Sequence, residues 1–270
     1  MIGFNFIGRL GRLGNQMFQY AALRGISSNR GYNFCLPIHQ NEVDDSIGNK
    51  LKTEIFSPFR MESVTSLNIQ LIDKDRPIVS EKGFEFDENL FNTCSDWVSL
   101  YGFFQSEKYF KNVEDIIRKD FTFKDEIFDP CQRMISQVES PISLHIRRTD
   151  YILNKNNHNN LDLDYYDMAL KHFNVDRQVI VFSDDPNWCK NQELFSSDRF
   201  LVSENESGYV DMCLMSLCSD HIIANSSFSW WGAWLCGNTE KKVIYPKDWF
   251  GPNLKNNSLK DLAPETWIRI

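Results

Sequence analysis

Residues 141–151, P-I-S-L-H-I-R-R-T-D-Y, have the pattern of a β-strand that ends in charged side chains. The first half alternates apolar and polar residues with period two, which is typical of a strand. In an open α/β sheet, ligands bind just outside the carboxyl ends of the strands. We therefore expect His145, Arg147, Arg148 and Asp150 at a ligand site. Adjacent guanidinium groups favour phosphate, because each planar fork donates two parallel hydrogen bonds. A solvated, salt-bridged loop is the alternative.

The chain after residue 141 alternates predicted strands with predicted helices. The strands are expected at 142–146, 179–182, 200–202, 221–224 and 243–245. The helices are expected at 165–173, 186–194, 208–218 and 229–236. This alternation implies right-handed crossovers and a parallel sheet. The polar stretch 153–164 is long for a strand-to-helix loop, so it is predicted to be functional or mobile.

The amino-terminal part begins with a strand at 2–7, a glycine-rich turn and a helix. Gly14, Asn15 and Gln16 stand at the start of this helix, where backbone N–H groups can bind an anion. The glycine spacing matches no phosphate-loop motif, so an ordinary tight turn is the alternative. The remaining predicted elements are a strand at 97–104, a helix capped by Ser106 and a helix at 130–138.

These elements divide the chain into two domains. We place the first at 1–138 and the second at 139–270, with the last residues able to pack back on the first domain. The chain has 270 residues, of which 42% are hydrophobic, and this is ample for the cores of one large or two modest domains.

Composition excludes several classes of protein. The net charge of −8 argues against nucleic-acid binding, which needs a basic face. Seven cysteines, an odd number without a C-x-x-C pair, indicate reduced, buried thiols and neither disulfides nor a zinc site. The amino terminus has no extended apolar segment, so we expect no signal peptide, and no apolar run is long enough to span a bilayer. We expect a cytoplasmic protein, and peripheral attachment at the inner face of the membrane stays open.

Three further segments place polar residues at the predicted sheet edge. The strand at 179–182 is followed by S-D-D, in which Asp185 suits a helix cap and Asp184 a ligand contact. Asp211 either stabilises a helix dipole or accepts hydrogen bonds from a guanine edge. Ser226 and Ser227 open the next helix, where hydroxyls and amides bind phosphate, although one of them suits a simple cap. The tryptophans at 230, 231 and 234 are interpreted as packing residues.

Four motifs together resemble those of the α-1,2-fucosyltransferases of glycosyltransferase family 11. They are G-R-L-G-N-Q-M-F-Q-Y-A near the amino terminus, H-I-R-R-T-D-Y (145–151), F-S-D-D (182–185) and D-M-C-L-M-S-L-C-S-D-H-I-I-A-N-S-S-F-S-W-W-G-A-W-L (211–235). The looser pattern is also similar to α-1,6- and protein O-fucosyltransferases. The resemblance implies an α/β protein of GT-B type, with two Rossmann-like domains facing across a cleft. It also implies that the carboxy-terminal domain binds the donor.

The resemblance also implies roles for individual residues. Arg147 would hold the β-phosphate of the donor and the departing GDP, and Asn15 and Gln16 beside Gly14 would face the reacting centre. The guanosine and diphosphate contacts would come from His145, Asp184, Asp211, Ser226, Ser227 and Phe228. Thr149 departs from the Gly of many members, and we expect this change to be tolerated. Asp150 is the first candidate for the general base and His158 the second; the alternative is that Asp150 only orients an arginine.

The implied reaction transfers L-fucose from GDP-β-L-fucose to the 2-hydroxyl of a terminal galactoside, with inversion, in surface-glycan or O-antigen synthesis. The acceptor would be a galactose-terminated oligosaccharide or a lipid-linked glycan, and no metal or other cofactor is expected. One alternative is a fucosyltransferase of another linkage, and another is a non-catalytic GDP-sugar-binding protein. A metal-dependent transferase would use an Asp-x-Asp pair, for which Asp162–Asp164 and Asp73–Asp75 are the candidates.

Overall fold

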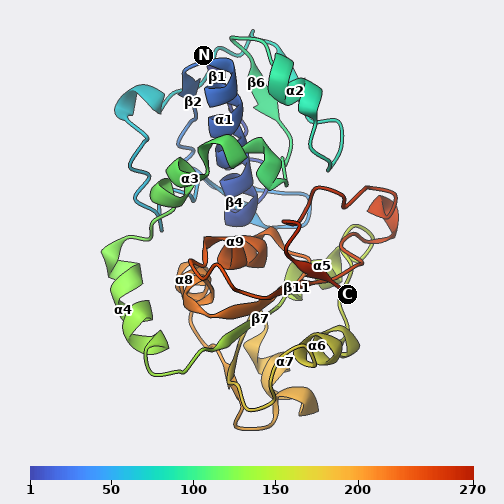
Figure 1. Cartoon of the computed structure of the whole chain (residues 1–270). Coiled ribbons are helices and arrows are strands. Elements are labelled where there is room, and N and C mark those ends of the chain that lie inside the picture. Colours follow the sequence, from blue (N-terminus) through green and yellow to red (C-terminus); the bar gives the residue numbers. More distant parts are fainter. The chain divides into compact units, whose positions relative to one another are not determined.

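The computed structural model describes all residues from 1 to 270, and they form two compact units (Figure 1). The N-terminal unit contains residues 1–123 and 257–264, and the C-terminal unit contains 124–256 and 265–270. The sequence boundary at 138 therefore lies 15 residues beyond the division at 123 in the structure. The shift concerns helix α4 (Asp125–Ile135), which packs against α8 (Gly208–Leu217) of the C-terminal unit.

The C-terminal unit is built on a parallel sheet of six strands. They are β7 (Ile142–Ile146), β8 (Val179–Ser183), β9 (Phe200–Val202), β10 (Asp220–Ile222), β11 (Val243–Tyr245) and β12 (Ile268–Arg269). Their spatial order is β12-β11-β10-β7-β8-β9. The five strands predicted from the sequence are confirmed, and β12, which has only two residues, was missed. The order is that of a doubly wound fold, and its direction reverses between β7 and β10.

Helices cover this sheet and give the strands their burial pattern. They are α4, α5 (Thr149–Leu153), α6 (Leu163–Leu170), α7 (Pro186–Lys190), α8 and α9 (Ser227–Leu235). Leu144 and Ile146 of β7 pack into a cluster with Tyr165 and Tyr166 of α6. The polar residues of β7 belong to the opposite face, because successive side chains of a strand alternate. There the Ser143 hydroxyl and His221 Nδ1 are 2.8 Å apart and buried.

The apolar residues that the sequence assigned to packing are buried. Trp230 and Trp231 are fully buried, with ring centroids 5.0 Å apart at 73°, and Trp234 is nearly so. All seven cysteines are buried and free, as predicted. None of the helices combines the length and the apolar character that a bilayer span requires.

The N-terminal unit contains a smaller parallel sheet of order β2-β1-β6-β5. Its strands are β1 (Ile2–Gly3), β2 (Phe34–Cys35), β5 (Ile78–Ser80) and β6 (Ser99–Tyr101), and β3 (Val43–Asp44) pairs separately with β4 (Lys50–Leu51). Its helices are α1 (Leu13–Arg30), α2 (Glu88–Thr93) and α3 (Glu114–Asp120). Five short 3₁₀ segments complete the chain: Ser66–Asn68, Glu107–Tyr109, Lys111–Val113, Glu193–Phe195 and Pro252–Leu254.

The predicted strand at 2–7 is shorter in the structure, because the chain turns directly after β1. The amide of Ile7 donates to the carbonyl of Phe4, and Gly8 has φ +75°, a left-handed conformation that glycine adopts without strain. Ser106 is a cap as predicted, with its hydroxyl accepting from the amide of Lys108 at the start of a 3₁₀ turn.

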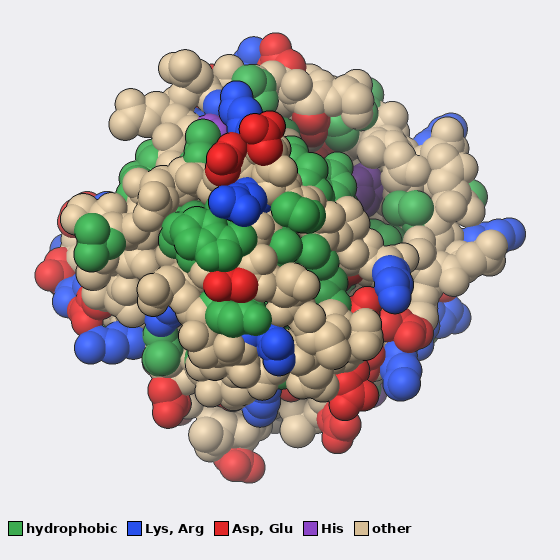
Figure 2. Space-filling view, turned by 90° about the horizontal axis from the view of Figure 1, so that it is seen from above, with side chains coloured by type: hydrophobic (Ala, Val, Ile, Leu, Met, Phe, Trp, Pro, Cys, Tyr) green, Lys and Arg blue, Asp and Glu red, His purple; other side chains and the backbone are tan.

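On the face shown in Figure 2, basic and acidic side chains are intermixed and apolar groups lie between them. This face therefore differs from the broad basic face that binding to a nucleic-acid backbone requires.

The buried His221 makes the stability of the C-terminal unit depend on pH. Burial, followed by the nearby Lys241 charge, lowers the pKa of His221 to about 3. Below about pH 6.5 the unfolded chain binds a proton that the folded chain does not, so stability is present above that pH and decreases on acidification. We expect the free energy of unfolding to fall between pH 6 and 4.5, with His221 contributing up to about 1.4 kcal/mol per pH unit.

This prediction is tested by urea unfolding of the wild type and of His221→Gln over that pH range. The variant should show the shallower dependence. His172→Gln, at an exposed position, is the matched control and should keep the wild-type slope. Equal slopes in His221→Gln and the wild type would contradict the prediction.

Candidate active site

The polar residues of the C-terminal unit gather where the strand order reverses. Arg147 directly follows β7, and Ser226 precedes α9 in the connection that follows β10. Because β7 and β10 are neighbours and their outward connections run to opposite sides, their carboxyl ends flank the position where doubly wound folds bind ligands.

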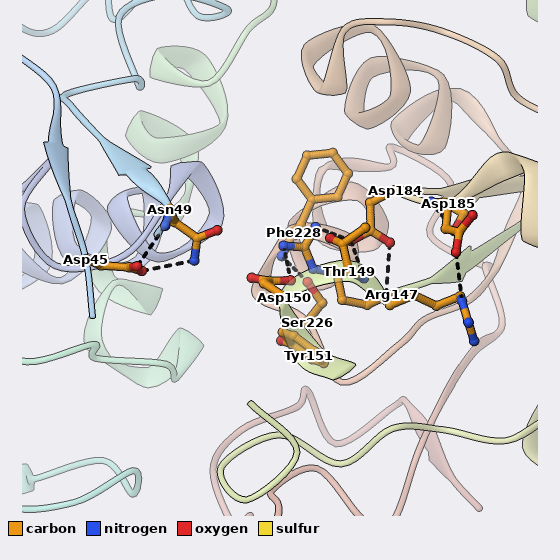
Figure 3. A network of polar contacts seen from close by, with 12 residues as sticks. Asp45, Asn49, Arg147, Thr149, Asp150, Tyr151, Asp184, Asp185, Ser226 and Phe228 are labelled. Carbon is orange, nitrogen blue, oxygen red and sulfur yellow. Dashed lines mark hydrogen bonds and ion pairs between the residues drawn. The ribbon is translucent and has the colours of Figure 1, made fainter. Parts of the chain in front are cut away.

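Arg147 is held by two carboxylates from different segments (Figure 3). Its Nη2 lies 2.6 Å from Asp150 Oδ1 and its Nη1 lies 3.1 Å from Asp184 Oδ2. Burial alone would lower the pKa of Arg147, but the two carboxylates outweigh it and the pKa is raised. Arg147 is therefore a fixed, oriented cation. The ion pair is also the arrangement expected if Asp150 serves only to orient the arginine.

Asp184 organises the turn after β7. Its carboxylate accepts hydrogen bonds from the amide of Arg148 at 2.9 Å and from the amide and hydroxyl of Thr149. Burial would raise the pKa of Asp184, but Arg147 and these hydrogen bonds lower it. The hydroxyl of Thr149, a group that glycine does not have, is hydrogen-bonded to Asp184. A threonine is therefore compatible with this turn, where many members of the family have glycine. Asp184 acts on Arg147 and the backbone in this structure, and the expected nucleoside contact stays a prediction.

Arg148 does not lie with Arg147, contrary to the expected pair of phosphate ligands. Its Nε is 3.2 Å from Asp185 Oδ2, and its guanidinium carbon is 3.7 Å from the ring centroid of Trp188 in α7. Asp185 also caps α7, as predicted, by accepting from the amide of Trp188 at 3.1 Å. Arg148 lies beyond the end of β7, at the start of α5, with φ −132° and ψ −68°, and its side chain has different partners from that of Arg147.

The start of α9 divides its two serines between two roles. Ser226 is buried and is the N-cap, with its hydroxyl accepting from the amide of Phe228 at 3.3 Å. Ser227 is half-buried, and its hydroxyl has no hydrogen-bond partner. Asn225 is structural, because its amide group donates to the carbonyls of Asn159 and Trp249, both at 2.8 Å. Ser227 and the first amides of α9 are therefore the groups left for an anion.

His145 and Phe228 lie side by side next to this helix start. Their ring centroids are 5.6 Å apart, at an interplanar angle of 40°. Burial, and then the charge of Arg147, lowers the pKa of His145 to about 3, so the imidazole is neutral. Its Nδ1 is buried and has no hydrogen-bond partner. A buried polar atom without a partner is costly, and a ligand group at this point would satisfy it.

Asp211 lies in the first turn of α8 but does not cap it. Its carboxylate accepts from the hydroxyl of Ser203 at 2.7 Å and from the side-chain amide of Asn205 at 3.0 Å. Burial raises the pKa of Asp211, and these two hydrogen bonds partly offset the shift. Since Ser203 directly follows β9, this group also lies at the carboxyl edge of the sheet.

The predicted residues of the N-terminal unit have structural partners. Gln16 is fully buried, and its amide donates to the carbonyls of Gly11 and Lys52 and accepts from the amide of Glu54. These contacts make Gln16 a support for the turn, and the expected position facing the reacting centre stays a prediction. Asn15 is half-buried and accepts from the side chain of Gln105 at 2.8 Å. Gly14 is buried in the first turn of α1.

The polar segment 153–164 is anchored instead of lying free. Asn157 accepts from the amide of Gly251, and His158 and Phe250 form an antiparallel bridge. The His158 ring stacks on the Tyr151 ring, with centroids 4.1 Å apart at 8°. Tyr151 also lies beside Arg147, with its ring centroid 5.5 Å from the guanidinium carbon, and the sequence reasoning did not select it. An aromatic residue four positions after Arg147, within the same motif, was the available signal.

In both Asp-x-Asp candidates, the first carboxylate accepts a hydrogen bond from a nearby backbone amide. Asp162 caps α6 by accepting from the amide of Tyr165 at 3.1 Å, and Asp73 accepts from the amide of Asp75 at 3.2 Å in a turn. These contacts are typical of capping and turn residues.

Comparisons with known proteins agree with this geometry. The model of glycosyl transferase family 11 matches residues 1–269. The chain is 34% identical to an alpha-1,2-colitosyltransferase of Escherichia coli, over 96% of both chains. It is 30% identical to the O-antigen biosynthesis glycosyltransferase WbnK of Escherichia coli, over 96% of this chain and 98% of the relative. A galactoside alpha-(1,2)-fucosyltransferase 1 of Bos taurus is 24% identical, over 96% and 74% respectively.

Among solved structures, POFUT1 in complex with GDP has a TM-score of 0.56, at 12% identity, over 90% of this chain and 97% of that one. This likeness shows the fold, which is of the predicted GT-B type. The motif resemblance is likewise confirmed over the whole chain. The chain therefore belongs to glycosyltransferase family 11 and is a glycosyltransferase.

Proposed function

We propose that this glycosyltransferase moves L-fucose from GDP-β-L-fucose to the 2-hydroxyl of a terminal galactoside, with inversion at the anomeric carbon. The observation that carries the proposal is the group of Arg147, the start of α9 and the unpartnered His145 where the strand order reverses. The named activities of the relatives, α-1,2 transfer and O-antigen biosynthesis, support the linkage and a role in surface-glycan synthesis. The acceptor would be a galactose-terminated oligosaccharide or a lipid-linked glycan at the inner face of the membrane.

The chemistry of the step explains this choice of residues. Breaking the bond between the sugar and the diphosphate develops negative charge on the leaving oxygens. Fixed donors aimed at that charge lower the barrier. Arg147, the hydroxyl of Ser227 and the amides of the first turn of α9 would supply them, and His145, Phe228 and Asp211 would contact the guanosine. We propose that this set neutralises the leaving group without a metal, so a chelator should leave turnover unchanged.

Two carboxylates, Asp150 and Asp184, already occupy the guanidinium of Arg147, which the diphosphate would also need. A diphosphate that binds Arg147 must compete with Asp150, whose carboxylate is 2.6 Å from the guanidinium. We propose that the diphosphate takes this place and that the released Asp150 accepts the proton of the acceptor hydroxyl. Asp184 would keep its contact, because the backbone amides of two residues also hold it.

A second candidate donor has its own support. The relative at 34% identity is named as a colitosyltransferase, and colitose is L-fucose without its 3-hydroxyl. A site that hydrogen-bonds this hydroxyl rejects the deoxy sugar strongly, whereas a site that does not can accept both. The likeness to POFUT1 carries the fold alone and favours neither a protein acceptor nor another linkage.

The proposed function is tested by turnover of GDP-fucose and GDP-colitose with a panel of galactose-terminated acceptors. NMR of the product should show an α-1,2 linkage, with EDTA present or absent. Preferred turnover of GDP-colitose would replace the donor in the proposal. Tight GDP binding without turnover of either donor would favour a binding protein, and loss of turnover in EDTA would remove the metal-free mechanism.

The two adjacent arginines give a matched pair of variants. Arg147→Lys keeps the charge but loses the fork that bridges two anions, so kcat/KM should fall by about 100-fold or more. Arg148→Lys should lower kcat/KM by less than about fivefold, because its guanidinium lies with Asp185 and Trp188. Steady-state kinetics and a thermal melt of each variant check this, and equal losses in the two variants would contradict the assignment.

The variant Asp150→Asn distinguishes two roles of Asp150, that of the general base and that of a carboxylate that only orients Arg147. If Asp150 competes with the diphosphate and later acts as base, the variant should bind GDP as tightly as the wild type or more tightly, while kcat falls by about 100-fold. Calorimetric GDP titration and single-turnover kinetics measure both quantities. The control is Asp185→Asn, which loses the ion pair to Arg148 but can still cap α7. A parallel loss of GDP affinity and kcat would mean that Asp150 only orients Arg147.

A further inference from the structure

Tyr151 contacts both sides of the proposed diphosphate site through one side chain. Its ring centroid lies 5.5 Å from the guanidinium carbon of Arg147. Its hydroxyl donates to the carbonyl of Asn225 at 2.9 Å, and the nearby side chain of Ser226 lowers the pKa of the phenol. Arg147 follows β7, and Asn225 and Ser226 lead into α9. Tyr151 therefore links the segments that follow β7 and β10, the two strands between which the strand order reverses (Figure 3).

The phenol itself is held firmly. Tyr151 is buried, and its ring stacks on that of His158 at 4.1 Å. Burial raises the pKa of Tyr151 to about 12, so the hydroxyl keeps its proton and can donate a hydrogen bond to the carbonyl of Asn225. The amide group of Asn225 is in turn tied to the carbonyls of Asn159 and Trp249. Two further segments, at Asn159 and Trp249, therefore hold Asn225 in place as the acceptor of the Tyr151 hydroxyl.

We propose that Tyr151 is a positioning residue for the diphosphate. It fixes the distance between the cation of Arg147 and the first turn of α9 by holding the carbonyl of Asn225 and the cap of Ser226. The inference rests on the proposed binding of a nucleoside diphosphate at this site. Tyr151 needs no contact with the ligand in this role, because the groups that it orients make that contact.

The proposal predicts a selective effect on the diphosphate end of the nucleotide. Tyr151→Phe keeps the ring beside Arg147 and removes only the hydroxyl. GDP affinity should fall by about 10-fold, the range expected for one buried hydrogen bond. Guanosine, which lacks the diphosphate, should bind as it does to the wild type. With GDP-fucose and an acceptor, kcat should fall as well, since the leaving group depends on the same donors.

The matched control is Tyr165→Phe. The Tyr165 hydroxyl is also buried and donates to a backbone carbonyl after β10, that of Ile223 at 2.7 Å. It contacts neither Arg147 nor Ser226, so this variant should lose similar stability but change GDP and guanosine affinity by less than about twofold. His158→Ala removes the stacked ring while leaving the Tyr151 hydroxyl, and it should weaken GDP binding by about threefold with guanosine unchanged. It therefore tests the proposal even if Tyr151→Phe does not fold.

Calorimetric titrations of GDP and of guanosine against the full chain distinguish the outcomes. Weaker GDP binding with unchanged guanosine binding in Tyr151→Phe, or in His158→Ala, supports the proposal. Equal loss for both ligands, or no loss for either, overturns it while the wild type still binds GDP. A wild type that binds no GDP would overturn the proposed function itself, and this inference with it.

Discussion

The ion pairs of Arg147 with Asp150 and Asp184 join segments that follow two neighbouring strands of one sheet. A partly buried guanidinium is stable only where carboxylates compensate for its lost hydration. Asp184 does so while it accepts from two backbone amides, which also fixes the turn that follows β7. The same carboxylate thus fixes both the position of the Arg147 cation and the conformation of the surrounding chain. The chemistry proposed for the carboxyl edge of the sheet depends on this arrangement.

The architecture of the C-terminal unit follows from its sequence to a large extent. Strands such as β7 and β8 have five residues with a clear apolar pattern, and the structure places them within one residue of the predictions. The strands of the N-terminal unit have two or three residues, which is too short for a period to emerge, and parallel pairing over long sequence distances leaves no local signal. The resemblance to family 11 supplied the fold type where periodicity could not.

The candidate site was predictable as a set of residues but not as a set of contacts. The motif contains Arg147, Asp184 and the serines, but it does not reveal that Arg148 has partners of its own, Asp185 and Trp188. The side-chain amide of Gln16 suggested a ligand contact, and nothing in the local sequence reveals that the backbone of Lys52 and Glu54, in a distant loop, binds it. Tyr151 was overlooked because its partners, Asn225 and Ser226, lie more than 70 residues away.

The chain enters the N-terminal unit a second time, at residues 257–264. There Asp261 pairs with Lys108 at 2.6 Å and accepts from the amide of Phe86, and Leu262 is buried. An exchange of halves between two members of this family therefore needs three junctions and not one. A chimera joined only near residue 123 would combine one parent's Lys108 with the other parent's returning segment, and mismatched packing there could be mistaken for a change in substrate preference.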